Sequence, residues 1–301
     1  MEKVFALRQR LKQFFGKYDI YLLPILKFLV MFVVLFLINE NLGYMDFLTR
    51  LPVMLILALI CCLLPWSVMS FVVAAFTLLH LTALSWEASG IFVVFLFLAA
   101  LMQYLFLPGF SIVIVLIPAA YYLHIPYVVP MILGLVGGAM SFIPAGMGVF
   151  AYYFLNCVQR NAGFLADSSF QGDMLETIAQ HLTQLLSGLR DNSLMLLSIV
   201  AFCVVTALIQ GIRRLSSDYA PYVAILIGAV ANVLIFMLGG FTLNISVPYM
   251  DMALGTVFAV LIALIAQFWL VAVDYSRTEY LQYEDDDYIY YVKAVDRKSV
   301  V

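Results

Sequence analysis

The sequence predicts an all-α fold: a polytopic transmembrane helical bundle of about eight spans, some short or broken, with a small cytoplasmic β-hairpin at the C-terminus. Composition is the first observation, because 65% of the residues are hydrophobic and 11% are charged, whereas about a quarter are charged in soluble domains. The second is the stretch from Leu51 to Gln159, which contains one formally charged side chain, Glu87. A soluble helix or strand needs a polar face, so this stretch belongs in a lipid bilayer. Its long apolar runs differ from the alternating pattern of a transmembrane β-barrel.

Residues 1–19 predict a cytoplasmic amphipathic helix that lies in the plane of the lipid headgroups. Val4, Leu7 and Leu11 recur at helical spacing, and five Lys and Arg side chains supply the polar face. Positive charge of this kind is retained on the cytoplasmic side of a membrane. The N-terminus is therefore expected inside the cell.

The N-terminal membrane bundle, 20–155, is expected to contain both full-length and short helices. Its first span holds Lys27, interpreted as a side chain that reaches the cytoplasmic interface rather than as a functional intramembrane charge. The apolar runs Leu51–Pro65 and Ser67–Leu84 are shorter than the roughly 20 residues that cross the hydrocarbon. They predict either two short spans or a re-entrant hairpin.

The segment from Pro130 to Leu155 is the most irregular part of this bundle. Gly134 and Gly138 have the small-xxx-small spacing of close helix packing, whereas Pro144 and Gly146 predict a broken helix. Broken helices also form binding sites in transporters. These four residues are therefore the candidate helix-packing or broken-helix site.

Part of this segment resembles a known family. The 15 residues Gly134–Gly148, with Phe142-Ile143-Pro144 among them, are similar to a segment of the AI-2E transporter family. The chain that follows departs from that family's pattern. The family's activity is therefore not carried over to this protein.

Residues 156–192 are predicted to be an extracellular loop that carries an amphipathic helix. Its leucines recur at helical spacing and form one apolar stripe, which would lie on the bilayer or on a partner. Leu182, Leu185 and Leu189 are the candidates for docking that partner. His181 lies off the stripe, which predicts a solvated histidine rather than a metal ligand.

Residues 193–273 are expected to supply the last three spans. The pair Arg213-Arg214 follows the first of them and should face the cytoplasm. The loop 156–192 is then outside, and both termini are inside. The predicted location is a bacterial cytoplasmic membrane.

Residues 274–301 form a cytoplasmic tail rich in acidic and aromatic residues. The stretch TEYLQYEDDDYIYYVKAV has two β-prone runs around an acidic turn, which predicts a β-hairpin. Tyr283, Tyr288 and Tyr290 are its candidates for docking on a protein partner. The chain from Leu194 to Val295 resembles uncharacterised polytopic membrane proteins of anaerobic, clostridial-type bacteria. That resemblance implies a bacterial cytoplasmic membrane and no particular activity.

Catalytic and cofactor motifs are not found in the sequence, among them HExxH, Cys-x-x-Cys, Walker A, GxGxxG and GxSxG. The four cysteines are interpreted as packing residues. The three histidines are far apart in sequence, and His80, His124 and Glu87 are the central titratable candidates. The sequence therefore predicts no enzyme, no cofactor, no metal and no nucleic-acid partner.

Two functions are consistent with this pattern. The first is a non-catalytic subunit or scaffold of a bacterial cell-envelope complex, in contact with the lipid bilayer and with a membrane or cytoplasmic protein partner. The alternative is a transporter of small neutral or apolar solutes, because an ion-coupled transporter needs charged groups inside its bundle. The subunit hypothesis is favoured, since the basic start, the outer amphipathic helix and the tail are features that a simple permease does not need.

Overall fold

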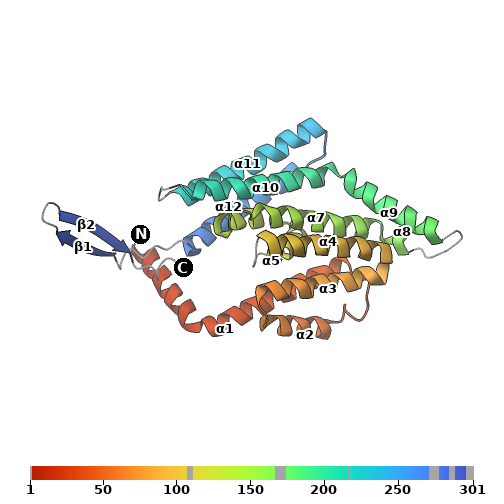
Figure 1. Cartoon of the computed structure of the whole chain (residues 1–301), viewed down its shortest axis with the longest axis horizontal. Helices are drawn as coiled ribbons and strands as arrows, with labels where there is room; N and C mark the ends of the chain where they lie inside the picture. The colour runs from red at the N-terminus through yellow and green to blue at the C-terminus, as the bar shows by residue number, and fades with distance from the viewer. Residues whose placement is uncertain are drawn as a thin grey trace.

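The protein is a bundle of helices in the computed structural model drawn in Figure 1. The structure describes the backbone of residues 2–106, 111–166, 174–215, 217, 219–270, 278–284 and 289–295, and the side chains of residues 17–18, 20–102, 104–105, 111–166, 176–215, 217 and 219–269. The helices are, in chain order, α1 (Glu2–Asn41), α2 (Leu51–Cys62), α3 (Trp66–Leu84), α4 (Trp86–Phe106), α5 (Ser111–Tyr122), α6 (Val128–Val136), α7 (Phe142–Arg160), α8 (Ala162–Ala166), α9 (Met174–Arg190), α10 (Ser193–Arg213), α11 (Ala220–Leu243) and α12 (Tyr249–Leu270).

Five helices in the described part of the chain are long and apolar enough to cross a membrane. The prediction of a helical fold with several helices able to span a membrane is confirmed at this level. By length and composition, five described helices qualify as membrane spans, whereas the sequence predicted about eight spans. Helices α2 and α5 are apolar but too short to be counted among the five. The five are Ile20–Asn41, Trp66–Leu84, Ser193–Arg213, Ala220–Leu243 and Tyr249–Trp269.

The predicted boundary between an amphipathic start and a first span falls inside one continuous helix, α1. The backbone leaves helical geometry at a single residue, Tyr18, where φ is −110° and ψ is 16°. The chain therefore changes direction within α1 near the point where the apolar span begins.

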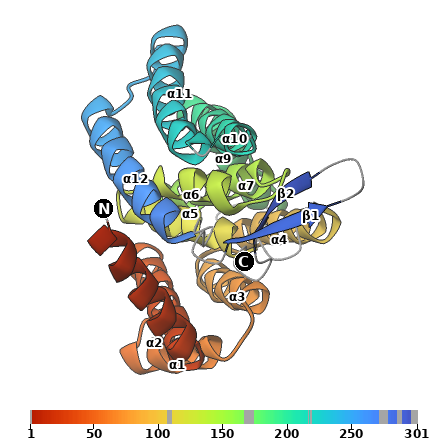
Figure 2. The same ribbon diagram turned by 90° about the vertical axis from the view of Figure 1, so that its left-hand side faces the viewer.

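The helices form three groups, which are seen most clearly in Figure 2. The middle group consists of α5, α6 and α7. On one side of it lie α10 and α11, and on the other lie α1, α2 and α3. Contacts of α10 with α6 and α7, and of α3 with α5, join the groups. The irregular segment of the sequence is thus held in the centre of the bundle.

Helices α5 and α6 form a hairpin whose flanking tyrosines contact the middle of α10. The ring of Tyr121 stacks on Phe202 with centroids 5.8 Å apart, and Tyr127 meets the same ring edge-on at 6.0 Å. Phe202 lies midway along α10. The turn between α5 and α6 therefore lies beside the middle of α10. From this turn α6 runs toward the end of the bundle where α10 ends at Arg213.

The sequence prediction left open two short spans or a re-entrant hairpin at 51–84. In the structure α3, within this stretch, is long and apolar enough to span a membrane, and a hairpin of two short helices lies at α5–α6. The reason is local. His124 takes a left-handed conformation with φ 59°, and Pro126 follows it, so α5 cannot continue. In contrast, α3 runs for 19 residues without such a stop.

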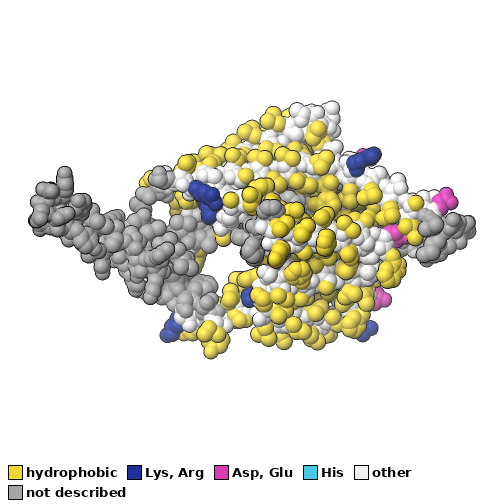
Figure 3. Space-filling model, viewed as in Figure 1, with side chains coloured by type: hydrophobic (Ala, Val, Ile, Leu, Met, Phe, Trp, Pro, Cys, Tyr) yellow, Lys and Arg dark blue, Asp and Glu magenta, His cyan; other side chains and the backbone are white. Residues whose placement is uncertain are grey.

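Hydrophobic side chains cover the middle of the surface seen in Figure 3. The acidic side chains visible on that face lie toward the end formed by α8 and α9. This distribution suits a protein surrounded by lipid along most of its length.

Two strands follow the last helix in sequence. β1 (Thr278–Glu284) pairs antiparallel with β2 (Ile289–Val295), and Tyr283 lies opposite Tyr290 in the register. Tyr288, the third tail residue singled out from the sequence, lies outside the described residues.

Candidate functional site

The predicted helix break lies between α6 and α7. Helix α6 ends at Val136, Gly137 is extended with ψ 166°, and α7 begins at Phe142. Pro144, which was expected to mark the break, instead occupies the first turn of α7, where a missing backbone N–H costs nothing. The position predicted from Pro144 and Gly146 was therefore wrong by about one turn, because the proline starts the second helix rather than interrupting the first.

Side chains on one face of α10 bind the backbone around this break. Gln210 Nε2 and Arg213 Nη2 donate to the carbonyl oxygen of Gly137, at 3.2 Å and 3.1 Å. Thr206 Oγ1 lies 3.4 Å from the carbonyl oxygen of Pro130, and Cys203 Sγ lies 3.3 Å from that of Phe142. Four positions of α10 thus hold the broken segment: Cys203, Thr206, Gln210 and Arg213.

These bonds satisfy backbone carbonyl groups at the break. A helix that ends inside a bilayer leaves carbonyl groups without partners, and lipid offers none. Gln210, which is 4% exposed, and the longer Arg213 provide donors to the carbonyl of Gly137. The break is therefore part of a specific joint between α6, α7 and α10.

Two of the candidate glycines allow close approach in this joint. A Cβ atom on Gly134 would lie 2.7 Å from the Cβ of Ile209 on α10, and one on Gly146 would lie 3.0 Å from Cys203 Sγ. Gly138, the other member of the predicted packing pair, has nothing within 4 Å of such an atom. Only Gly134 of that pair lies against a neighbouring helix in the structure.

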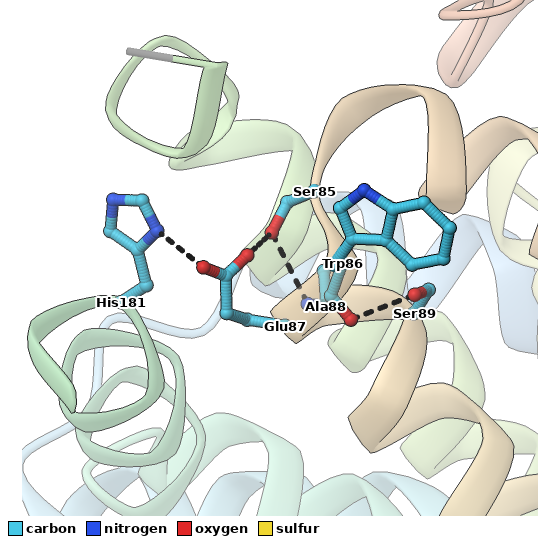
Figure 4. A network of polar contacts seen from close by, with 6 residues as sticks. All are labelled: Ser85, Trp86, Glu87, Ala88, Ser89 and His181. Atoms are coloured by element: carbon cyan, nitrogen blue, oxygen red, sulfur yellow. Dashed lines mark hydrogen bonds and ion pairs between the residues drawn. The ribbon is translucent and has the colours of Figure 1, made fainter. Parts of the chain in front are cut away.

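A second polar group lies at the opposite end of the bundle and is drawn in Figure 4. Ser85 Oγ accepts the backbone N–H of Ala88 and so caps the start of α4. The same hydroxyl donates to Glu87 Oε2 at 2.5 Å, and the other carboxylate oxygen lies 3.3 Å from His181 Nδ1 on α9. This contact joins the α3–α4 connection to α9.

His181 is buried, with 7% of its surface exposed, so the prediction of a solvated histidine was wrong. Its ring packs edge-on against Phe164 with centroids 4.9 Å apart, and its other side faces Glu87. Helical spacing placed His181 off the leucine stripe but gave no information about α4 and α8, which cover it. His181 and Glu87 line a cavity of about 470 Å³ together with Tyr44 and Trp86.

Glu87 lies in the first turn of α4, at the end of the bundle formed with α9. Burial by itself raises the pKa of this carboxyl. Hydrogen bonds from Ser85, from the backbone and from His181, together with the nearby His181 ring, outweigh this effect, and the pKa is lowered from its ordinary value. Glu87 is therefore a carboxylate near neutral pH.

The leucine stripe of α9 is used within the protein. Leu185 is 0% exposed and Leu189 is 6% exposed, and both belong to the main hydrophobic core. Leu182 is partly buried, whereas Leu186 is 55% exposed. The structure therefore corrects the assignment of Leu185 and Leu189 to partner docking, because α4 and α7 already cover them.

The central titratable residues do not meet. His80 is fully buried in α3, where its Nδ1 accepts the backbone N–H of Met45 at 3.3 Å. His124 forms the turn after α5, and Glu87 contacts His181. In the described part of the chain, no three His, Cys, Asp or Glu residues lie together as a metal site would require.

The polar face of α10 was missed in the sequence. A signal for it exists, since Cys203, Thr206, Gln210 and Arg213 are spaced by three or four residues within an otherwise apolar helix. Such a pattern indicates polar side chains that face a common neighbour. The identity of that neighbour is given only by the fold.

Comparisons of the chain with protein-family models, with curated proteins and with solved structures gave no match.

Proposed function

We propose that this protein is a non-catalytic integral membrane subunit or scaffold of a bacterial cell-envelope complex. The observation that carries the proposal is the use of polar side chains inside the bundle to join helices to one another. Gln210 bonds α10 to the α6–α7 break, Tyr153 OH lies 3.2 Å from Ser198 Oγ, and Asn232 Nδ2 donates to Thr256 Oγ1 at 3.0 Å. Polar groups engaged in this way stabilise a fixed arrangement of helices.

We further propose eight crossings with both termini in the cytoplasm. In this arrangement α1, α2, α3, α4, α7, α10, α11 and α12 cross, and α5–α6 is a re-entrant hairpin. Five crossings then precede residues 156–192, which places this loop outside and the pair Arg213-Arg214 inside. The positive-inside rule supports that orientation.

Cysteine labelling tests this topology. In a background without the four native cysteines, a cysteine at Ser168 should react with an impermeant thiol reagent on intact cells, and one at Ser299 should react only after permeabilisation. The opposite pattern would refute the orientation.

The partner is proposed to dock on the tail strands. Within the described residues β1 pairs with β2 alone, and an isolated two-stranded hairpin is marginally stable in water. A third strand from a partner would stabilise it. The acidic sequence Glu284–Asp287 disfavours anionic lipid as the docking surface.

Copurification tests the subunit proposal. The tagged full chain, extracted from its native membrane in a mild detergent, should retain a partner at fixed stoichiometry. A chain that lacks residues 278–295 should be extracted equally well and lose that partner. Retention of no protein by the full chain would refute the proposal.

A second candidate function, transport of small neutral or apolar solutes, is favoured by one observation, the broken α6–α7 segment beside a re-entrant hairpin. Purified protein in liposomes distinguishes the two. Solute flux without any copurifying partner would favour the transporter, and a partner without flux would favour the subunit.

A further inference from the structure

A small cavity, here called the inner cavity, lies between α1, α3, α4, α5 and α7. Its volume is about 60 Å³. One water needs a cavity of about 10–15 Å³, and an engineered cavity of about 150 Å³ in another protein binds benzene or xenon. The inner cavity therefore has room for a molecule that is smaller than benzene.

The lining of the inner cavity is almost entirely apolar. Among the described residues that line it, Thr77 and Tyr122 have a polar side-chain atom and none is charged. Thr77 Oγ1 already donates to the carbonyl oxygen of Val73 at 2.9 Å, and the buried hydroxyl of Tyr122 has no hydrogen-bond partner in the described part of the chain. A buried water normally has two to four polar partners, so two hydroxyls, one of them engaged, are the least that could hold it. The lining thus favours an apolar occupant over water.

The inner cavity shares a wall with a larger groove between α1 and the α5–α6 hairpin. The groove has a volume of about 580 Å³, and its lining residues Leu29 and Val136 are 57% and 47% exposed on the apolar surface of the bundle. Val34 of α1 and Ala119 of α5 line both the groove and the inner cavity. One layer of side chains therefore separates the inner cavity from a groove that faces lipid.

From these observations we infer that the inner cavity binds a small uncharged apolar molecule, of the size of a dissolved gas or a short hydrocarbon. The molecule enters from lipid through the groove, past Val34 and Ala119. Apolar molecules favour hydrocarbon over water, so the bilayer supplies them to the groove. Inside the cavity they make the dispersion contacts that an empty space forfeits. This inference does not rest on the proposed subunit function.

Xenon is the probe that tests the site, because it is apolar, uncharged and smaller than benzene. The full chain in lipid nanodiscs carries a ring-fluorinated tyrosine in place of Tyr122, and its fluorine NMR resonance is followed as the xenon pressure rises. The change in this resonance should level off, as it does when a site fills. The same label in place of Tyr104, which is 86% exposed on α4, should respond in proportion to pressure. A proportional response at both positions would overturn the inference.

Water is the competing occupant, and the hydroxyl of Tyr122 would hold it. A ring-fluorinated phenylalanine in place of Tyr122 removes this hydroxyl and keeps the label. Its resonance should level off at similar xenon pressures. Levelling that occurs only without the hydroxyl would show that the native cavity is filled by water, and would overturn the inference.

Filling the cavity offers a matched pair of substitutions on α3. Ala74 lines the inner cavity, whereas its neighbour Ala75 is exposed and lines neither the cavity nor the groove. Ala74→Leu should abolish the levelling seen at the Tyr122 label, and Ala75→Leu should retain it. Levelling that persists in Ala74→Leu would place the xenon elsewhere and overturn the site. The comparison of Tyr122 with Tyr104 needs no substitution in the cavity wall, so it decides the matter if Ala74→Leu fails to fold.

The route of entry is tested by two valines of equal burial. Val34 and Val73 are each 3% exposed and both line the inner cavity, but Val73 does not line the groove. Val34→Ala and Val73→Ala enlarge the cavity by the same two methyl groups, and Val34→Ala alone thins the shared wall. Exchange of xenon between cavity and lipid, measured by saturation transfer and scaled by the occupancy, should be several-fold faster in Val34→Ala. Equal rates in the two variants would overturn entry through the groove.

Discussion

Helices are held together in different ways at the α6–α7 break and around α9. At the break, Gly134 lets α6 approach α10, and Gln210 and Arg213 satisfy a backbone carbonyl. At the outer end, Leu185 and Leu189 of α9 are buried against the rest of the bundle, and α9 also carries the contact between His181 and Glu87.

The two joints correspond to the two ways in which helices associate. Lipid is as apolar as leucine, so helices inside a bilayer associate through close packing and satisfied polar groups. Near water, burial of apolar surface drives association instead. One chain thus uses two kinds of helix contact, and each kind predicts a different response to substitution.

The largest effect is expected at the outer joint. Leu185→Ala removes a fully buried leucine and should lower the free energy of unfolding by about 2–5 kcal/mol, because it leaves a cavity beneath α9. Leu186→Ala, one residue further along and 55% exposed, should change it by less than about 0.5 kcal/mol. Thermal unfolding in detergent measures both. Equal losses would show that α9 is not held by its buried face.

The two glycines of the inner joint should differ next most. Gly134→Leu forces α6 and α10 apart, since even a Cβ would lie 2.7 Å from that of Ile209, and should cost about 1–3 kcal/mol. Gly138→Leu meets open space in the described structure and should be tolerated. The yield of monodisperse protein in size-exclusion chromatography compares them. A greater loss in Gly138→Leu would contradict the packing seen here.

A smaller effect is expected from the donors on α10. Gln210→Leu leaves Arg213 as the side-chain donor to Gly137 and should cost about 1 kcal/mol. Changing both residues, with Arg213→Met as the second substitution, should cost more than the sum of the single changes, because the carbonyl then has neither donor. Strict additivity in chemical unfolding would show that the two bonds are not linked.

The smallest effect concerns pH at the outer joint. Because the folded-state pKa of Glu87 is lowered from its ordinary value of 4.5, its contribution to stability is present above that pH and is lost as the pH falls through the folded-state value. Glu87→Gln should weaken the dependence of the unfolding temperature on pH below about 4.5, with a change of less than about 1 kcal/mol at neutral pH. An unchanged acid dependence in Glu87→Gln would assign it to other groups.

The amino-acid sequence by itself determined that this protein has several helices apolar enough to cross a membrane, that α9 has an apolar stripe, and that the helix is interrupted between Pro130 and Leu155. These features depend on composition and on local periodicity, which neighbouring residues in the chain are enough to define. The proline and glycine content indicated a break, although the break itself lies at Gly137.

Only the tertiary structure decided which residues meet. His181 and Glu87 are 94 residues apart, Gln210 and Gly137 are 73 apart, and the short helices α5 and α6 form a hairpin beside α10. A lipid-facing surface and a protein core are equally apolar, so hydrophobicity cannot distinguish Gly134, which packs on Ile209, from Gly138, which does not. That distinction depends on which helix lies alongside, and the relevant helix comes from a distant part of the chain.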